Sequence, residues 1–443
     1  MLTLTRATRA DALSGRFRPP GDKSISHRAL MLGAISIGLT RISGLLESAD
    51  VLATANALES LGAGIKRDGD DWLVEGCGIG GLKAPVDVLN MGNSGTGARL
   101  LMGIIASHPF STIVSGDASL NERPMGRIIE PLTQMGATFE ARDGGRLPLT
   151  LKGATSPLPL TYTLPVPSAQ VKSAILLAAL NTPGETTITE PIPCRDHTER
   201  MLAHFGADLH LKADADGRRI ILRGERELTG RPVHVPADPS SAAFPLVAAL
   251  ICPGSQITLE GICANPLRTG LFDTLREMGA DIAFGPAQEQ DGEPVTDITC
   301  RASTLKGITV PPERAPAMID EYPVLAIAAA MAKGTTTMRG LGELRIKESD
   351  RLAAMAKGLA ACGVDVEELD DGLIIHGKGN IPGGAKVESH LDHRIAMSFL
   401  VLGIAAENPV EITGGATIDT SFPGFAKAMN GLGAHITEEK TSP

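Results

Sequence analysis

A cluster of cationic and hydroxyl side chains in residues 20–28 is the first feature of this sequence that could carry chemistry. After a Pro-Gly turn, Lys23, Ser24 and Arg28 stand at the start of an apolar stretch that predicts a helix over residues 29–37. The N-terminus of a helix presents unpaired N–H groups and a partial positive charge, and it therefore favours an anion. An ammonium, hydroxyls and a guanidinium in the same place predict a site for a small anion. A capped helix with two surface cations is an equally compatible interpretation at this point.

The composition excludes several classes of function. The chain has 443 residues, of which 43% are hydrophobic, so it can form more than one domain with a buried core. A net charge of −10 and an aromatic content of 3% argue against a nucleic-acid surface, which needs a basic stripe and stacking aromatics. The six cysteines form no C-x-x-C pair, which is typical of reduced thiols. Because we find neither a signal-peptide core nor a convincing membrane span, we expect a soluble cytoplasmic protein.

A glycine that ends a helix recurs six times along the chain. In the first unit, a strand over 38–43 precedes a helix over 50–61, and two strand-like segments, 65–67 and 72–75, follow the glycine as a hairpin. Residues 2–5 alternate as a further strand would. Successive glycines are 70 to 84 residues apart, which is too regular to dismiss and too long for a solenoid repeat. They are Gly62, Gly136, Gly206, Gly279, Gly363 and Gly433.

Each of these glycines has an Ala-rich helix with a polar first turn upstream of it. Such a helix is apolar on almost every side, so it should lie in a core and be wrapped by strands. Six units of this kind predict two domains of three units. Pro-rich passages at residues 18–21 and 231–236 place one domain at 22–234 and the other at 1–21 with 235–443. Two crossings between the domains predict a hinge and a closable cleft.

Seven motifs follow one another in order between about Leu13 and Ala434. Together they resemble the family of 5-enolpyruvylshikimate-3-phosphate synthases (3-phosphoshikimate 1-carboxyvinyltransferases). The resemblance implies an α/β fold of two inside-out α/β domains, each of three βαβαββ repeats, joined by a two-strand hinge. The motifs are Gly21-Asp-Lys-Ser-Ile-Ser-His-Arg28, Gly92-Asn-Ser-Gly-Thr96, Glu122-Arg-Pro-Met125, Ser168-Ala-Gln170, Ile319-Asp-Glu-Tyr-Pro323, Lys347-Glu-Ser-Asp-Arg351 and Asp392-His-Arg394.

The family reaction transfers the carboxyvinyl group of phosphoenolpyruvate to the 5-hydroxyl of shikimate 3-phosphate and releases phosphate, in the shikimate pathway to chorismate and the aromatic amino acids. The resemblance implies these small-molecule substrates, a monomer, no cofactor or metal, and no nucleic-acid or membrane partner. For shikimate 3-phosphate it implies binding by Lys23, Ser24, Arg28, Ser168, Ala169, Gln170, Arg195, Asp320 and Lys347. For phosphoenolpyruvate it implies binding by Lys23, Asn93, Gly95, Arg123, Gln170, Arg351 and Arg394.

Addition followed by elimination requires two proton transfers, and the resemblance implies that two carboxylates are catalytic. Asp320 would accept the proton of the 5-hydroxyl, and Glu348 would give a proton to the methylene carbon and later recover it. Lys347 would compensate the charge of the tetrahedral intermediate. Without the other motifs, the residue pattern favours a helix cap for Asp320 and a solvated first turn for Glu348.

The chain also departs from the family pattern. Many members carry a second Ser where this chain has Ala169, and a Lys in the segment that matches residues 419–423. The herbicide glyphosate occupies the phosphoenolpyruvate site in this family. Tolerant members can carry Ala at Gly95, so this chain should leave room for the inhibitor.

Two other functions stay open. The sibling transferase that acts on UDP-N-acetylglucosamine typically has Lys-Asn in place of Lys23-Ser24 and a Cys in the loop matching 116–127, which this chain lacks. A non-catalytic anion-binding scaffold would be expected to lose Asp320 or Glu348, and both are present.

Overall fold

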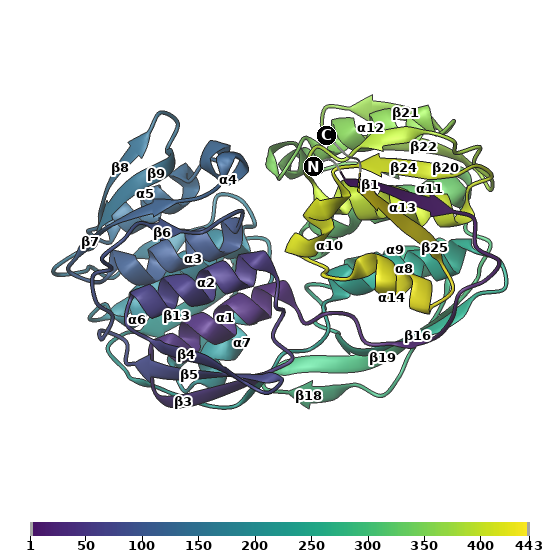
Figure 1. Ribbon diagram of the computed structural model, residues 1–443. Helices are drawn as coiled ribbons and strands as arrows, with labels where there is room; N and C mark the ends of the chain where they lie inside the picture. Colours follow the sequence, from purple (N-terminus) through teal and green to yellow (C-terminus); the bar gives the residue numbers. More distant parts are fainter. Residues whose placement is uncertain (1–2, 441–443) are drawn as a thin grey trace. The chain divides into compact units, whose positions relative to one another are not determined.

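The structure, a computed structural model, describes residues 3–440 and divides them into two compact units (Figure 1). The N-terminal unit comprises residues 21–235 and 289–293, and the C-terminal unit comprises the rest of the described chain. The boundaries expected at 22 and 234 lie one residue inside these limits, whereas the membership of 289–293 in the N-terminal unit was not predicted.

The N-terminal unit contains three sheets, and each sheet is built around the strands of one repeat of the sequence. The third repeat shows the complete βαβαββ order, with β10 parallel to β11 and with β13 antiparallel to both β11 and β12. The first repeat comprises α1 (Lys23–Ala34), β3 (Ser36–Ser43), α2 (Ala49–Ser60), β4 (Gly64–Asp68) and β5 (Asp71–Cys77). The second comprises β6 (Leu89–Asn90), α3 (Gly95–Ala106), β7 (Ser111–Ser115), α4 (Ala118–Glu122), α5 (Gly126–Gln134), β8 (Thr138–Arg142) and β9 (Arg146–Lys152). The third comprises β10 (Thr161–Thr163), α6 (Ala169–Leu180), β11 (Glu185–Glu190), α7 (His197–His204), β12 (Asp208–Asp214) and β13 (Gly217–Arg223).

The first repeat lacks a leading strand of its own. The short strands β14 (Leu228–Thr229) and β15 (Val233–His234), from the end of the unit, pair parallel with β3 and fill that place. The unit is therefore closed by its own last strands.

The C-terminal unit repeats this plan and uses the start of the chain to complete it. Strand β2 (Ser14–Phe17) pairs parallel with β16, and β1 (Thr3–Thr8) lies between β24 and β25. The fourth repeat comprises α8 (Pro239–Ile251), β16 (Gln256–Cys263), α9 (Gly270–Glu277), β17 (Asp281–Phe284), β18 (Gln288–Gln290) and β19 (Glu293–Arg301). The fifth comprises η1 (Pro312–Arg314), α10 (Ala315–Met318), η2 (Ile319–Glu321), α11 (Tyr322–Met331), β20 (Lys333–Met338), η3 (Gly342–Ile346), α12 (Arg351–Ala361), β21 (Asp365–Leu369) and β22 (Gly372–Lys378). The sixth comprises β23 (Lys386–Glu388), α13 (His393–Ala405), β24 (Val410–Thr413), η4 (Gly415–Thr420), α14 (Phe425–Gly431) and β25 (His435–Lys440).

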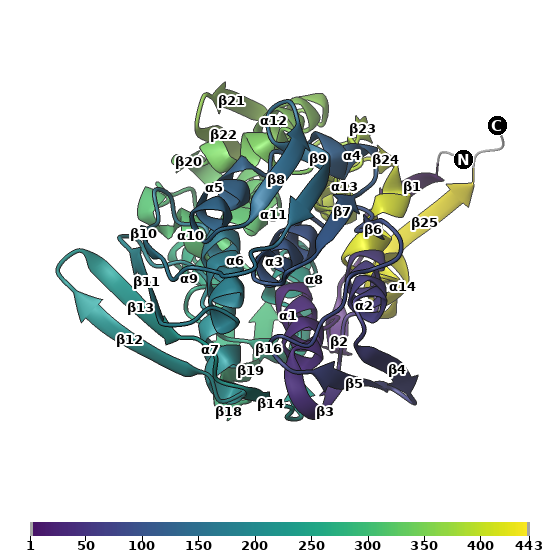
Figure 2. The ribbon, with the colours of Figure 1, turned by 90° about the vertical axis from the view of Figure 1, so that its left-hand side faces the viewer.

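Each unit is organised around the first helix of its repeats, as expected from their apolar composition. In the N-terminal unit, α1, α3 and α6 run side by side (Figure 2), and α3 approaches α6 closely at Gly103. A Cβ at Gly103 would lie 2.4 Å from the carbonyl oxygen of Ala174, so only glycine permits this spacing. In the C-terminal unit, α8, α11 and α13 pack against one another, and every residue of α8 is buried.

The six glycines predicted to end helices all have positive φ angles, between 85° and 107°. Each follows the last helix of its repeat, where the left-handed conformation lets the chain turn into the next strand. One expected boundary is wrong. The first core helix covers residues 23–34, not 29–37, because the Ser36 hydroxyl donates to the carbonyl of Leu32 at 2.6 Å and β3 begins there. The strand expected at 2–5 is β1, although Leu2 lies outside the described residues.

The segment 289–293 is fixed to the N-terminal unit by polar contacts. Buried Glu293 lies 2.6 Å from His197 Nδ1, and Arg200 donates to the carbonyl of Gly292 at 2.8 Å. Asp291 accepts from the backbone N–H of His234 at 2.7 Å. These contacts place the segment against the start of α7.

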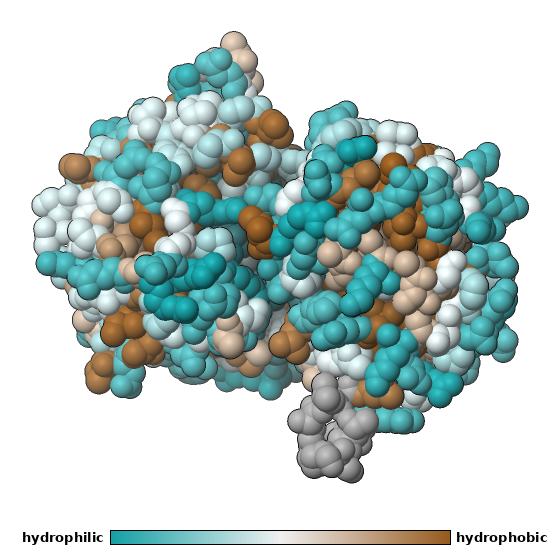
Figure 3. All heavy atoms as spheres, turned by 90° about the horizontal axis from the view of Figure 1, so that it is seen from above, coloured by the Kyte–Doolittle hydropathy of each residue, from teal (hydrophilic) through white to brown (hydrophobic). Residues whose placement is uncertain are grey.

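The face drawn in Figure 3 is mostly polar. On the face drawn in Figure 3, hydrophobic residues form small separate groups between hydrophilic ones. Within residues 3–440, no helix has the length and apolar character needed to cross a membrane.

Candidate active site

Arg28 is a buried cation of the N-terminal unit with several hydrogen bonds to protein groups. It lies on α1 and is 4% exposed. Its Nε donates to Thr198 Oγ1 at 2.7 Å, its Nη2 to Ser173 Oγ at 2.8 Å, and its Nη1 to the carbonyl of Ser24 at 2.9 Å. Helices α1, α6 and α7 therefore fix the orientation of one guanidinium, as an anion site requires.

Lys23 is the first residue of α1, where Asp22 caps the helix by accepting from the N–H of Ile25 at 2.8 Å. Its ammonium pairs with the carboxylate of Asp50 in the first turn of α2. His27 is fully buried behind them and contacts Thr54 Oγ1 at 2.8 Å. Burial, helped by the charges of Lys23 and Arg28, lowers the pKa of His27 well below its usual value. The environment of His27 therefore favours the neutral imidazole.

The second repeat brings Asn93 and Arg123 together. Arg123 Nη2 donates to Asn93 Oδ1 at 2.6 Å and to Ser119 Oγ at 3.1 Å. Asn93 in turn donates to Asp117 at 2.8 Å, so both ends of its amide are held. Gly95 is the first residue of α3. A Cβ on Gly95 would lie 3.1 Å from Arg123 Nη1, which is tighter than usual contact.

Gln170 connects the third repeat to the second. Its Nε2 donates to Thr96 Oγ1 at 3.0 Å, and its Oε1 accepts from Arg99 Nη1 at 3.1 Å. Ser168 caps α6, and Ala169 is its first residue. Sequence reasoning missed Arg99, although it stands four residues after Gly95 and hence on the same face of α3. Sequence reasoning also missed Thr198, which accepts a hydrogen bond from Arg28. Its position in the first turn of α7 could have indicated it.

Lys172, on α6, is held by carboxylates inside the N-terminal unit. Its side chain is completely buried, and Nζ lies 2.6 Å from Glu190 and 2.8 Å from Glu199. Arg218 contacts the same two carboxylates, so the charges balance inside the unit. This ionic cluster stands beside half-buried Arg195, which directly precedes α7.

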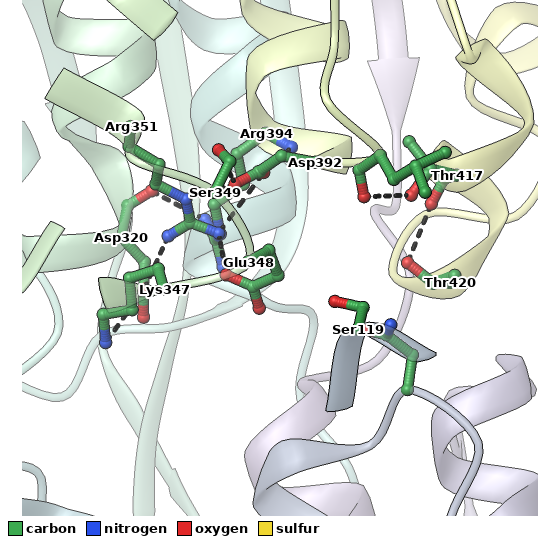
Figure 4. Close-up of polar contacts among 12 residues, drawn as sticks. Ser119, Asp320, Lys347, Glu348, Ser349, Arg351, Asp392, Arg394, Thr417 and Thr420 are labelled. Atoms are coloured by element: carbon green, nitrogen blue, oxygen red, sulfur yellow. Dashed lines mark hydrogen bonds and ion pairs between the residues drawn. The ribbon is translucent and has the colours of Figure 1, made fainter. Parts of the chain in front are cut away.

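In the C-terminal unit, Arg351 is surrounded by carboxylates (Figure 4). Its side chain is 1% exposed at the start of α12. Nε lies 2.8 Å from Asp392, Nη2 lies 2.6 Å from Glu348, and Nη1 lies 3.3 Å from Asp320. Burial alone would lower the pKa of Arg351, but Asp392, Glu348 and Asp320 raise it above its usual value. The guanidinium is therefore permanently charged.

The two carboxylates expected to be catalytic thus contact the same side chain. Asp320 lies in η2, immediately before core helix α11, and Glu348 lies in the turn between η3 and α12. Lys347 Nζ is 3.9 Å from Asp320, which makes it a weaker partner than Arg351. Asp320 and Glu348 retain side-chain exposures of 16% and 23%, so both remain accessible to a ligand. Neither caps a helix or lies in open solvent, which were the alternatives considered from the sequence.

Arg394 completes this group from α13. Asp392 caps that helix by accepting from the N–H of Arg394 at 2.9 Å, and its carboxylate also holds Arg351. Arg394 Nη1 donates to the carbonyl of Asp320 at 2.9 Å. Asp320, Lys347, Glu348, Arg351 and Arg394 therefore lie together, and Asp392 joins them as a residue to which the sequence assigned no role.

The segment that often carries a Lys in the family forms η4 and the turn after it. Thr420 donates to the carbonyl of Thr417 at 2.7 Å, and Thr417 donates to the carbonyl of Leu391 at 2.8 Å (Figure 4). The hydroxyl of Ser421 is buried and has no hydrogen-bond partner among the described residues. Lys347, Arg351 and Arg394 are the cations that the described part of this unit places beside Asp320.

Two units of three βαβαββ-type repeats, with arginines and carboxylates gathered near helix starts, define an enolpyruvyl-transferase fold. The chain is 61% identical to the 3-phosphoshikimate 1-carboxyvinyltransferase of Rhodospirillum rubrum over 98% of this chain and 97% of that protein. It is 62% identical to the enzyme of the same name from Paramagnetospirillum magneticum, over 97% of each. The EPSP synthase structure from Acinetobacter baumannii superposes with a TM-score of 0.87 at 44% identity, covering 99% of this chain and 100% of that one.

A sequence profile of the EPSP synthase (3-phosphoshikimate 1-carboxyvinyltransferase) family matches residues 7–429. The chain belongs to this family. The enolpyruvyl transferase NikO from Streptomyces tendae shares the fold, with a TM-score of 0.76 at 19% identity.

Proposed function

We propose that this chain transfers the carboxyvinyl group of phosphoenolpyruvate to the 5-hydroxyl of shikimate 3-phosphate and releases phosphate. Its membership of the family supports the reaction. The observation that carries the residue roles is the contact of Asp320 and Glu348 with the single buried guanidinium of Arg351. A fixed positive charge beside two carboxylates can bind an anionic substrate and stabilise charge during proton transfer.

In this mechanism, Asp320 accepts the proton of the 5-hydroxyl as the oxygen attacks C2 of phosphoenolpyruvate. Glu348 gives its proton to the methylene carbon, and a tetrahedral intermediate with a methyl group results. Glu348 then takes a proton back from that methyl group while the C–O bond to phosphate breaks. Lys347, beside Asp320, offsets the charge that develops on the intermediate.

The substrate anions are held by cations whose orientations the protein fixes in advance. We assign phosphoenolpyruvate to Arg123, Arg351 and Arg394, with Asn93 and Gly95 beside it. We assign shikimate 3-phosphate to Ser24, Arg28, Ser168, Ala169, Arg195 and Lys347, and both substrates to Lys23 and Gln170. Arg28 and Arg351 each have several hydrogen bonds to protein groups, so little side-chain freedom is lost when an anion binds.

Phosphate release from phosphoenolpyruvate tests the reaction. We expect release with shikimate 3-phosphate and none with UDP-N-acetylglucosamine. Release with the UDP-sugar alone would assign the chain to the sibling activity, and release with neither would support the non-catalytic scaffold. We also propose that the enzyme acts as a cytoplasmic monomer, and free thiols at the six cysteines support a reducing compartment.

A further inference from the structure

A buried polar chain leads from the start of α8 to Arg394 in the C-terminal unit. Arg268 Nη2 donates to Asp238 Oδ1 and to Ser240 Oγ, at 3.0 Å in both cases. The Ser240 hydroxyl donates to Glu321 Oε1, and the same oxygen lies 3.4 Å from Arg394 Nη1. Among Asp238, Ser240, Arg268 and Glu321, it is Glu321 that contacts Arg394 directly.

Glu321 has no role in the helix that it precedes. It occupies the N-cap position of α11, but its side chain makes no capping hydrogen bond. The residue is 3% exposed, and Oε2 is buried without a hydrogen-bond partner among the described residues. A buried carboxylate with an unused oxygen is costly unless a cation compensates it. Two cations compensate Glu321. Arg394 contacts it directly, and Arg268 is connected to it through Ser240.

The contacts of Arg394 all lie on one side of its guanidinium. Nη1 is shared between the carbonyl of Asp320 and the carboxylate of Glu321. In the described part of the chain, no protein group contacts its Nε or Nη2, and the side chain keeps 14% of its surface exposed. The Nε–Nη2 edge is the one with which arginine binds a carboxylate or phosphate through two parallel hydrogen bonds. Glu321 therefore anchors one corner of the guanidinium and leaves the anion-binding edge available.

We propose that Glu321, oriented by Ser240, is a positioning residue that fixes Arg394 for the anion of phosphoenolpyruvate. This inference rests on the substrate role proposed above for Arg394. Glu321 touches neither substrate; it acts by holding Nη1 and by partly neutralising Arg394 between turnovers. Asp392 has the corresponding role for Arg351, so each of the two arginines has its own buried carboxylate.

The test is a double-mutant cycle between Glu321→Gln and Arg394→Lys, with kcat and the KM of each substrate measured. Glutamine keeps the shape of the side chain and removes its charge. We expect Glu321→Gln to raise the KM for phosphoenolpyruvate about tenfold, to change kcat and the KM for shikimate 3-phosphate less than twofold, and to have no further effect in the Arg394→Lys background. Glu277→Gln is the matched control, because Glu277 pairs with Arg314 at 2.6 Å elsewhere in the same unit and should leave all three constants unchanged.

Ser240→Ala removes the hydroxyl that orients Glu321, and it should raise the same KM in the same direction. This second variant keeps the test valid if Glu321→Gln does not fold. If Arg394→Lys leaves the KM for phosphoenolpyruvate unchanged, the substrate role of Arg394 is wrong. If Arg394→Lys raises that KM but Glu321→Gln and Ser240→Ala do not, or if Glu321→Gln has the same effect in both backgrounds, the positioning role of Glu321 is wrong.

Discussion

Replacing Glu348 by glutamine should separate the two roles of the Glu348–Arg351 pair. Arg351 is 1% exposed, and its Nη2 lies 2.6 Å from Glu348 Oε2, so an incoming phosphoenolpyruvate must compete with this carboxylate for the guanidinium. Glutamine has the same shape and still offers one acceptor, but it carries no charge and cannot donate a carboxyl proton. The variant should therefore bind the substrate more tightly and turn it over more slowly.

The size of both effects follows from the contact. A hydrogen bond involving a charged group contributes about 1.5–3 kcal/mol net, and a neutral one about 0.5–1.5 kcal/mol. The hydrogen bond from Arg351 to glutamine is therefore about 1 kcal/mol weaker than the one to glutamate, and phosphoenolpyruvate displaces it more easily. The Kd for phosphoenolpyruvate should fall about fivefold. Losing a general acid should lower kcat by roughly 10²- to 10⁴-fold.

Calorimetric titration with phosphoenolpyruvate in the presence of shikimate 3-phosphate measures the first effect, and a phosphate-release assay measures the second. The exchange of solvent deuterium into the methylene group of phosphoenolpyruvate should also stop. Glu368→Gln, which alters an exposed pair with Arg345 at 2.9 Å, is the control and should change nothing. Unchanged affinity together with a kcat within twofold of the wild type would refute both the competition and the proton transfer.

Three further outcomes follow from the structure. Asp320→Asn should retain substrate binding and lose turnover by orders of magnitude in the phosphate assay, and near-normal turnover would place the base elsewhere. Glyphosate should inhibit competitively with phosphoenolpyruvate, and Gly95→Ala should weaken this inhibition about tenfold or more while raising the substrate KM less, because the added methyl would lie 3.1 Å from Arg123. A wild type that resists glyphosate and an alanine variant that behaves identically would contradict this. Burial lowers the pKa of His27 in the folded protein below about 6.5, the pKa of histidine in the unfolded chain. The contribution of His27 to stability is therefore fully present above about pH 6.5 and is lost as the pH falls from there towards the folded pKa. In denaturant titrations between pH 7 and 5, His27→Gln should therefore flatten the decline of the unfolding free energy, and an unchanged slope would show that other groups control it.

The sequence predicted the repeats well because their signals are local. Two signals can be recognised without knowing the fold: an Ala-rich helix that is apolar on all sides, and a glycine that ends the later helix of the same repeat. The first helix was misplaced because Ile35 and Ile37 continue the apolar run, whereas the hydroxyl of Ser36 ends the helix. Ile37 is 56% exposed on β3, which hydrophobicity alone does not anticipate.

Roles that depend on distant partners were harder to predict. Lys172 lies two residues after the Ser168-Ala-Gln170 motif, but its partners are Glu190 and Glu199, which approach it only in the folded unit. The contact of Glu321 with Arg394 is likewise invisible in the sequence, since 73 residues separate the two. Spacing identifies which residue types stand at a helix start; it does not tell which of them face one another across a core.

The short segment 289–293 has a consequence for how this protein is made. During synthesis, residues 21–235 leave the ribosome well before the segment that packs against α7. Until residue 293 has been synthesised, His197 therefore lacks its buried partner, Glu293. The N-terminal unit can collapse early, but it cannot reach its final form until a stretch of the later sequence is available. A gene fragment that ends at residue 235 would lack this carboxylate and the Asp291 contact to His234. Attempts to divide the protein into separately expressed halves should therefore retain residues 289–293 as a fused or co-expressed peptide.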